Sequence, residues 1–340
     1  MKHLRKTSAI LLVLAMFAVT TAQAGEQVVS PFDGLDPLTL LLSTVTHIGS
    51  AKEQHAQEFA RLVNEYSEGK ITVEIYAGGI LGGHAETTAG LATGLTHIDV
   101  AGPGFVSQFL GRPEIFFEAM NYLYNDVEHY QRIWAEGGVG WDLMADLLAD
   151  TPFISVSAGL DGVRYFTSNV PIHTIDDVRG MLFRVAPLAI EAAKFAVLGL
   201  RPTPLPFTDT YTALQQGLVT GQENPLLTIE SGALYEVQQY LVATAHNLVT
   251  DHLFMDRNFF NSLPEAYREV ILRAGAETSG WRTQLAINLE AELLEKMQNE
   301  YRMTLIVPTD LDVWDQLSSE FALTYEGGVF VEIYELFKSN

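Results

Sequence analysis

The sequence predicts an α/β protein with two lobes, in which mixed sheets are flanked by helices and one long helix spans both lobes. Strand and helix patterns alternate between residues 38 and 101, an order typical of a parallel sheet with helices on its faces. Residues 264–303 are almost unbroken helix formers, a run longer than a typical globular helix. A chain of 340 residues with no cysteine relies on its own core, and a core of this size commonly divides into two.

The first 24 residues have the features of a secretory signal peptide. Cationic side chains open it, residues 9–19 form a short apolar core, and Ala22-Gln23-Ala24 fits a small-residue cleavage site. This core is too short to cross a bilayer, and no later run approaches about 20 uninterrupted apolar residues. We therefore expect an exported chain with no stable membrane anchor.

The composition is strongly acidic, with 42 Asp and Glu residues against 20 Lys and Arg and a formal net charge of −22. Nucleic acids and anionic membrane surfaces both select for basic patches, so neither is an expected partner. An anionic ligand would be repelled by the field of the whole chain. It would have to be held by a few donors placed close to it.

In the first half of the chain, apolar periods define the elements. Ala56, Phe59, Ala60 and Val63 recur at helical spacing, which predicts a helix over 51–67. The other elements expected in this half are strands at 38–46, 71–76 and 97–101 and helices at 84–93 and 126–149.

In the second half, a strand at 153–158 stands close to the point where a second lobe should begin. The run at 264–303 could form one continuous helix that braces the two lobes. The remaining elements expected here are a strand at 180–186, helices at 188–198 and 208–216, and two apolar stretches within 240–256.

Arg184 and Asn224 carry the strongest functional signal. Arg184 lies in the apolar strand LFRVAP, near its carboxyl end and without an acidic neighbour in sequence. Its partner is either an acidic side chain distant in sequence or the carboxylate of a ligand, which a guanidinium can bind through two parallel hydrogen bonds. Asn224-Pro225 fits a helix start, with Asn as the N-cap and Pro at the first helical position. The alternative is an Asn224 side chain that faces a cleft and contacts an anion.

Three further residues each have a structural and a functional interpretation. Arg164 could stack on its neighbour Tyr165 or support a ligand site. Phe207 could belong to the core or form a platform for a ligand. Glu86 follows the turn LGG and would lie in the first turn of a helix, where the helix dipole alone accounts for a carboxylate.

Catalytic and metal-binding patterns are absent from the sequence. It contains no GxSxG, HExxH, P-loop or GxGxxG motif, and its nine histidines are dispersed. His47 and His55 stand eight residues apart across a strand-helix junction, which is weak support for a metal site. We therefore expect neither an enzyme nor a bound cofactor or metal.

Two long segments of the chain resemble a known family. The segments GVRYFTSNVPIHTIDDVRGMLFRVAP and PTPLPFTDTYTALQQGLVTGQENPL are similar to the solute receptors of TRAP transporters (tripartite ATP-independent periplasmic transporters) of the DctP type. The likeness extends to the N-terminal part, in HIGSAKEQHAQEFARLVNEYSEGKITVEIYAGGILGGHAETTAGLATGLTHIDVAGPG. It therefore covers most of the chain after the signal peptide.

The resemblance implies a two-lobed fold like that of periplasmic binding proteins, closing on a small organic acid. The implied lobes are 25–155 with about 248–285, and 156–247 with about 286–340. The implied partners are that acid and the membrane subunits of a TRAP transporter, and the implied location is the periplasm. Exported hydrolases or lyases of acidic sugars, with Glu86 or His47 as the acid-base group, and ligand-sensing accessory proteins are the alternatives.

The resemblance also implies roles for individual residues. Arg184 would pair with the ligand carboxylate, Asn224 would add a second contact to it, and Arg164 would support both. Phe207 would flank the ligand.

At the other lobe, Glu86 and, as a weaker candidate, His47 would contact the far end of the ligand, which favours sugar acids or hydroxy acids over plain dicarboxylates. The chain departs from the family pattern in Arg-Val-Ala-Pro, where Arg-Val-Pro is common, and in Leu160-Asp161-Gly162.

Overall fold

Ten strands form one mixed sheet in the computed structural model, which describes residues 30–135 and 137–340. The main path runs in the order β2-β1-β3-β9-β4-β7-β5-β6, and β8 and β10 attach beside β4. The predicted signal peptide lies outside the described residues. The strands are β1 Leu38–Thr44, β2 Ile71–Tyr76, β3 Ile98–Ala101, β4 Phe153–Ser168, β5 Leu182–Val185, β6 Arg201–Pro204, β7 Gly221–Pro225, β8 Tyr240–Val242, β9 Leu248–Asp256 and β10 Thr304–Ile306.

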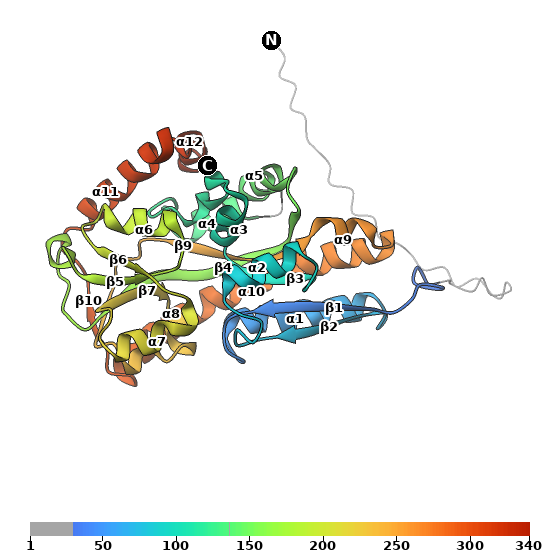
Figure 1. Ribbon diagram of the computed structural model, residues 1–340, viewed down its shortest axis with the longest axis horizontal. Coiled ribbons are helices and arrows are strands. Elements are labelled where there is room, and N and C mark those ends of the chain that lie inside the picture. Colours follow the sequence, from blue (N-terminus) through green and yellow to red (C-terminus); the bar gives the residue numbers. More distant parts are fainter. Residues whose placement is uncertain (1–29, 136) are drawn as a thin grey trace, which may run out of the picture.

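Helices cover both faces of this sheet (Figure 1). The predicted parallel β-α-β-α-β unit is confirmed, because β1 pairs in parallel with both β2 and β3. The α-helices are α1 Ala51–Tyr66, α2 His84–Ala92, α3 Pro103–Leu110, α4 Val127–Ile133, α5 Val139–Leu148, α6 Ala189–Ala196, α7 Phe207–Gln215, α8 Leu226–Ser231, α9 Arg257–Ser262, α10 Glu265–Asn299, α11 Leu311–Thr324 and α12 Val331–Lys338. Short 3₁₀ helices are η1 Pro113–Ala119, η2 Ile175–Val178, η3 Leu234–Glu236 and η4 Tyr325–Gly327.

The strand β4 joins the two lobes. Its first part pairs with β9, and its last part pairs with β7 and β8. The prediction of a strand ending at residue 158 was wrong, because Asp161-Gly162 looks like a loop but forms a bulge within the strand. The register shifts between Leu160 and Gly162, where Gly162 has φ +144°. Only glycine adopts such a backbone without strain, so the strand bends here instead of ending.

The single helix predicted over 126–149 was also wrong. The chain forms two helices, α4 and α5, separated around Gly137 and Gly138. Gly137 has φ +71°, and a Cβ on Gly138 would lie 2.5 Å from the carbonyl oxygen of Ile133. Two adjacent glycines therefore allow a sharp turn that the apolar pattern on either side conceals.

The predicted long helix is confirmed as α10, which has 35 residues and passes along both lobes (Figure 1). It lies unusually close to β4. A Cβ on Gly275 would lie 1.7 Å from the carbonyl oxygen of Val156, and a Cβ on Gly159 would lie 2.6 Å from Cβ of Arg282. Glycine on both elements thus lets the helix and the central strand approach at backbone distance.

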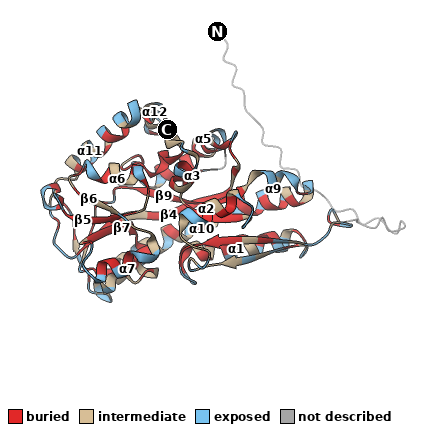
Figure 2. Ribbon diagram, viewed as in Figure 1, coloured by how far each residue is buried: buried red, intermediate tan, exposed pale blue. Residues whose placement is uncertain are grey.

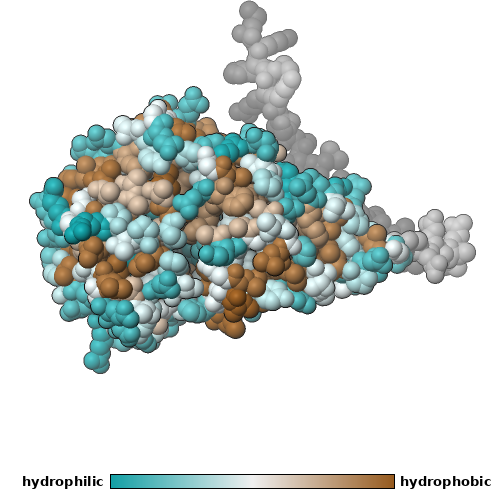
Figure 3. Space-filling view, in the orientation of Figure 1, coloured by the Kyte–Doolittle hydropathy of each residue, from teal (hydrophilic) through white to brown (hydrophobic). Residues whose placement is uncertain are grey.

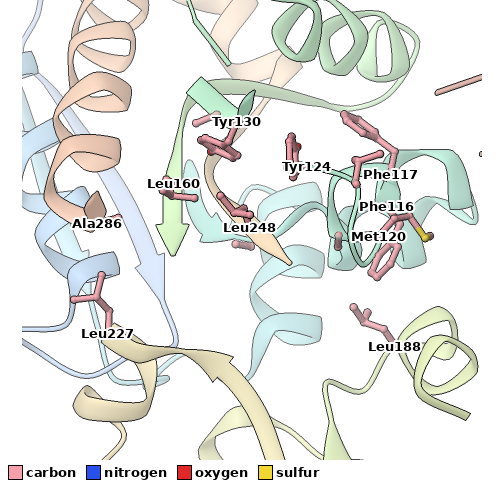
Figure 4. Close-up of a cluster of buried hydrophobic side chains, with 14 of the residues drawn as sticks. Phe116, Phe117, Met120, Tyr124, Tyr130, Leu160, Leu188, Leu227, Leu248 and Ala286 are labelled. Carbon is pink, nitrogen blue, oxygen red and sulfur yellow. The ribbon is translucent and has the colours of Figure 1, made fainter. Parts of the chain in front are cut away.

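Buried side chains form a continuous interior between the elements, and the strands are largely buried in Figure 2. The largest apolar cluster draws on both lobes. In the close-up of Figure 4, Phe116 of η1 lies toward Leu188 beside α6, while Leu160 of β4 and Leu248 of β9 lie between them and Ala286 of α10. None of the helices in the described part of the chain is long and apolar enough to cross a membrane.

We expect Gly275→Ala to lower the free energy of unfolding by about 3 kcal/mol or more, because the new methyl group would overlap a backbone carbonyl that cannot rotate away. Urea or thermal denaturation followed by circular dichroism measures this loss. Gly280→Ala is the matched control on the same helix. A Cβ there meets nothing within 4 Å, so it should stabilise the protein by about 0.5–1 kcal/mol. Equal effects of the two substitutions would contradict the close contact.

Candidate functional site

A cavity of about 300 Å³ lies between the two lobes. On the face shown in Figure 3, apolar residues gather over the middle of the molecule and hydrophilic residues lie mainly around its margin. The wall draws on α1, α2, α3 and η1 from the first half of the chain and on β5, α6, α7 and β7 from the second half. A volume of this size suits a small metabolite.

Arg184 lies in the wall of this cavity and is 4% exposed. Its Nε and Nη2 donate to the carbonyl oxygen of Leu205 at 3.0 and 2.8 Å. Among the described residues no carboxylate forms an ion pair with it. Burial, with the Arg164 guanidinium nearby, lowers the pKa of Arg184 to about 10. The guanidinium is therefore charged at neutral pH and lacks an anionic partner in the protein.

Arg164 has an anionic partner within the protein. Its Nη2 lies 2.8 Å from Oε1 of Glu223, and its Nε also contacts that carboxylate. His246 adds a third contact, with Nε2 3.2 Å from Oε2 of Glu223. Burial acts to raise the pKa of Glu223, but Arg164 and His246 outweigh it and hold that pKa well below its usual range. In place of stacking on Tyr165, Arg164 thus forms a buried ion pair with Glu223, which His246 also contacts, and the sequence analysis missed both of these residues.

Asn224 does not cap a helix, so that prediction was wrong. Residues 221–225 form β7, Pro225 takes the N-cap position, and α8 begins at Leu226. Asn224 is 6% exposed, and its Oδ1 accepts a hydrogen bond from Nη2 of Arg164 at 3.2 Å. Pairing of β7 with β4 thus overrides the local helix signal and places the amide beside the guanidinium in the cavity wall.

The remaining predicted residues occupy different positions. Phe207 is the first residue of α7, is half-buried and lines the cavity. Glu86 lies in the first turn of α2, as expected, and also lines the cavity. His47 lies on an exposed loop beside the cavity-lining Thr46 and is not itself part of the wall. Five of the six predicted residues are therefore brought together around one cavity, and their contact with a ligand stays a prediction.

A buried ion cluster borders the cavity and was missed by the sequence analysis. Lys52 of α1 contacts Asp161 of β4 at 2.8 Å and also Asp251 of β9. Arg282 of α10 contacts the same two carboxylates at 2.7 and 3.1 Å. Although burial acts to lower it, Asp161 and Asp251 raise the pKa of Lys52. Two positive and two negative charges thus compensate one another where four elements meet.

His84 is a further cavity residue that the sequence analysis did not select. It is the first residue of α2, and its ring stacks on Phe105 with a centroid distance of 4.3 Å. Burial, Lys52 and Arg184 together lower its pKa to about 3. The imidazole is therefore neutral at physiological pH and presents an aromatic face instead of a charge.

The wall elements from the two halves of the chain contact each other directly around the cavity. Gln108 of α3 accepts a hydrogen bond from the backbone N–H of Ala189 and donates to the carbonyl oxygen of Pro187. Lys194 of α6 donates to the carbonyl oxygen of Ala119 at 2.9 Å. Within residues 30–135 and 137–340, no cluster of three or more His, Asp or Glu side chains could hold a metal ion.

Comparison with known proteins gives a consistent result. The family described as "Bacterial extracellular solute-binding protein, family 7" (DctP) matches residues 42–325. The sialic acid-binding periplasmic protein SiaP of Vibrio cholerae is 30% identical over 264 residues, which are 77% of this chain and 81% of SiaP.

Solved structures share the fold over almost the whole chain. A TRAP periplasmic solute-binding protein of Roseobacter denitrificans with bound L-galactonate superposes with a TM-score of 0.82 at 23% identity, over 89% of this chain and 99% of that one. A second, from Desulfovibrio salexigens with bound orotic acid, gives a TM-score of 0.80 at 25% identity over 88% and 98% of the two chains.

We expect Glu223→Gln to destabilise the protein by about 3–5 kcal/mol, because it leaves the Arg164 guanidinium buried without its anion. Denaturation at neutral pH measures the loss. The contribution of the carboxylate is present above its unfolded pKa of about 4.5 and is lost as the pH falls further, so the gap between variant and wild type should shrink in acid.

The control is Asp176→Asn, which breaks the exposed pair with Arg179 and should leave the unfolding midpoint nearly unchanged. A Glu223→Gln variant as stable as this control at neutral pH would contradict a structural role for the ion pair.

Proposed function

The chain belongs to family 7 of the bacterial extracellular solute-binding proteins, and we propose that it captures a small organic acid between its lobes and delivers it to the membrane subunits of a TRAP transporter. The family match covers residues 42–325, most of the chain. Two proteins similar to this chain support an acid as the ligand, since one is named for sialic acid and another was solved with orotic acid.

The observation that carries the proposal is the unpaired guanidinium of Arg184. A buried charge is costly unless it is paired, and the only acceptor that the described residues supply is one carbonyl oxygen. A ligand carboxylate would provide the missing charge and could accept two parallel hydrogen bonds from the guanidinium. The cavity wall at Arg184 therefore lacks a carboxylate, which is the group that an organic acid would bring.

Other residues would complete the carboxylate site. Asn224 would contribute an amide contact, and Arg164 would hold that amide in place through the hydrogen bond described above. Phe207 would pack against the body of the ligand. Across the cavity, Glu86 would contact polar groups of the ligand, and so would His47 if the ligand extends past the adjoining Thr46.

Closure would follow from contacts to both lobes at once. We assign residues 25–155 and about 248–285 to the first lobe, and 156–247 and about 286–340 to the second. A ligand that contacts both lobes at once would shift an equilibrium between open and closed forms toward the closed form. We further propose that residues 1–24 are removed on export to the periplasm and that the ligand leaves the protein chemically unchanged.

Arg184→Ala should weaken binding by about 3 kcal/mol or more, roughly a hundredfold, because it leaves a desolvated carboxylate without its charge partner. The acid to test is first identified by mass spectrometry of whatever co-purifies with the folded protein, supplemented by a thermal-shift panel that includes sialic and orotic acids. Isothermal titration then compares wild type with the variant.

Arg179→Ala is the control, because Arg179 is exposed and pairs with Asp176 away from the cavity. Near-normal affinity in Arg184→Ala would refute the assignment. The proposed function itself is refuted if no acid co-purifies with the wild-type protein and no acid of the thermal-shift panel stabilises it at millimolar concentration.

A further inference from the structure

A second charged residue in the cavity wall lacks a complete set of partners. Glu118 lies on the 3₁₀ helix η1, lines the cavity and is 0% exposed. The sequence gives no sign of its position, because it follows the apolar run Ile115-Phe116-Phe117 and could equally face solvent. Figure 4 places the neighbouring Phe116 toward Leu188 of the other lobe, so η1 lies where the lobes meet.

One oxygen of Glu118 is held firmly. Its Oε1 lies 2.7 Å from Nε2 of His252, and Nδ1 of His252 lies 2.8 Å from the hydroxyl of Ser155. The Ser155 hydroxyl itself donates to the carbonyl oxygen of Ser157 at 3.1 Å, and a carboxylate only accepts, so Nε2 of His252 is the donor to Glu118. The carboxylate is therefore oriented by a hydrogen bond from His252 through one oxygen alone.

The other oxygen has no hydrogen-bond partner in the described part of the chain. Oε2 of Glu118 is buried, and no donor reaches it. A buried carboxylate oxygen without a donor is costly, since the group has lost its water and gained nothing in exchange. Such an oxygen in the wall of a ligand cavity is a position at which a ligand can supply the donor.

The buried charges of the cavity wall otherwise pair within the protein. Lys52 and Asp161 belong to the four-membered cluster, and Arg164 pairs with Glu223. Glu191 pairs with Lys194 at 3.0 Å. Glu86 also lines the cavity but is exposed to water. Among the described residues, the two buried groups of the wall without a Lys, Arg, Asp or Glu partner are the cation Arg184 and the anion Glu118, whose neighbour is His252.

We infer that Glu118 is a specificity-determining residue, which accepts a hydrogen bond from a hydroxyl or a cationic nitrogen of an acid whose carboxylate is bound by Arg184. This inference rests on the proposed function. A carboxylate accepts hydrogen bonds and repels a second anion. The cavity should therefore favour acids that also carry a donor and should disfavour dicarboxylates.

Matched ligands test this preference in the wild-type protein. Gluconate and glucarate differ only in a terminal hydroxymethyl group or carboxylate. Butyrate, γ-hydroxybutyrate, γ-aminobutyrate and succinate differ only in the group at the end remote from the shared carboxylate. In titration calorimetry we expect the donor-bearing member of each set to bind about tenfold to a hundredfold more tightly than the dicarboxylate. If only γ-aminobutyrate binds more tightly than its dicarboxylate partner, the donor is a cationic nitrogen. If gluconate and γ-hydroxybutyrate bind more tightly than theirs, the donor is a hydroxyl.

Glu118→Gln tests the residue. Glutamine keeps an oxygen that can accept a hydrogen bond from His252 and removes the negative charge. The affinity ratio between the donor-bearing acid and the dicarboxylate should therefore fall by about tenfold or more. Glu114→Gln is the matched control on η1, because Glu114 pairs with Arg112 and does not line the cavity. If Glu118→Gln does not fold, the wild-type preferences and the more conservative Glu118→Asp carry the test.

The outcomes separate this inference from the proposed function. Acids that bind in an Arg184-dependent manner, with dicarboxylates as tight as their donor-bearing partners, would overturn the role of Glu118 and leave the receptor intact. An unchanged preference in Glu118→Gln would overturn it as well. If no acid, including any that co-purifies, binds the wild type, both proposals fall together.

Discussion

The contact between α10 and β4 is the constraint on which the rest of the structure depends. Glycines at positions 275 and 159 bring the helix and the central strand to backbone distance, so β4 is fixed along both lobes. Arg282 of α10 then reaches Asp161 of β4, and Lys52 of α1 joins the same cluster. The lobes thus share one strand, one helix and one set of compensated charges beside the cavity. The proposed closure of the lobes would have to occur around this fixed region.

The local charge of the cavity wall differs from the net negative charge of the chain. A chain with a net charge of −22 repels an anion at long range, yet the binding of a carboxylate needs only a local excess of positive charge. Most cations in the cavity wall are already neutralised by buried carboxylates, and Arg184 is the exception. Selectivity then follows from which charges remain uncompensated. In the same way, the carboxylate of Glu118 would act against a second carboxylate on the ligand.

Much of the fold could be predicted because its signals are local. The alternation up to residue 101 and the helix at 264–303 are properties of neighbouring residues, and both were confirmed. The errors occurred where glycine or distant pairing decides the outcome. The turn at Gly137 and Gly138 split one predicted helix, the bulge at Gly162 extended a predicted strand, and the pairing of β7 with β4 turned an expected helix start at Asn224-Pro225 into a strand end.

The sequence by itself determined the fold class, the long bracing helix and the residues most worth testing, Arg184 and Asn224, because a guanidinium in an apolar strand and a characteristic motif are visible within a few positions. Only the tertiary structure decided which charges compensate one another. Glu223 and Arg164 are 59 positions apart, Lys52 and Asp251 are 199 apart, and Glu118 meets His252 across 134. Whether a buried charge is paired or available to a ligand depends on such contacts, and local sequence does not encode them.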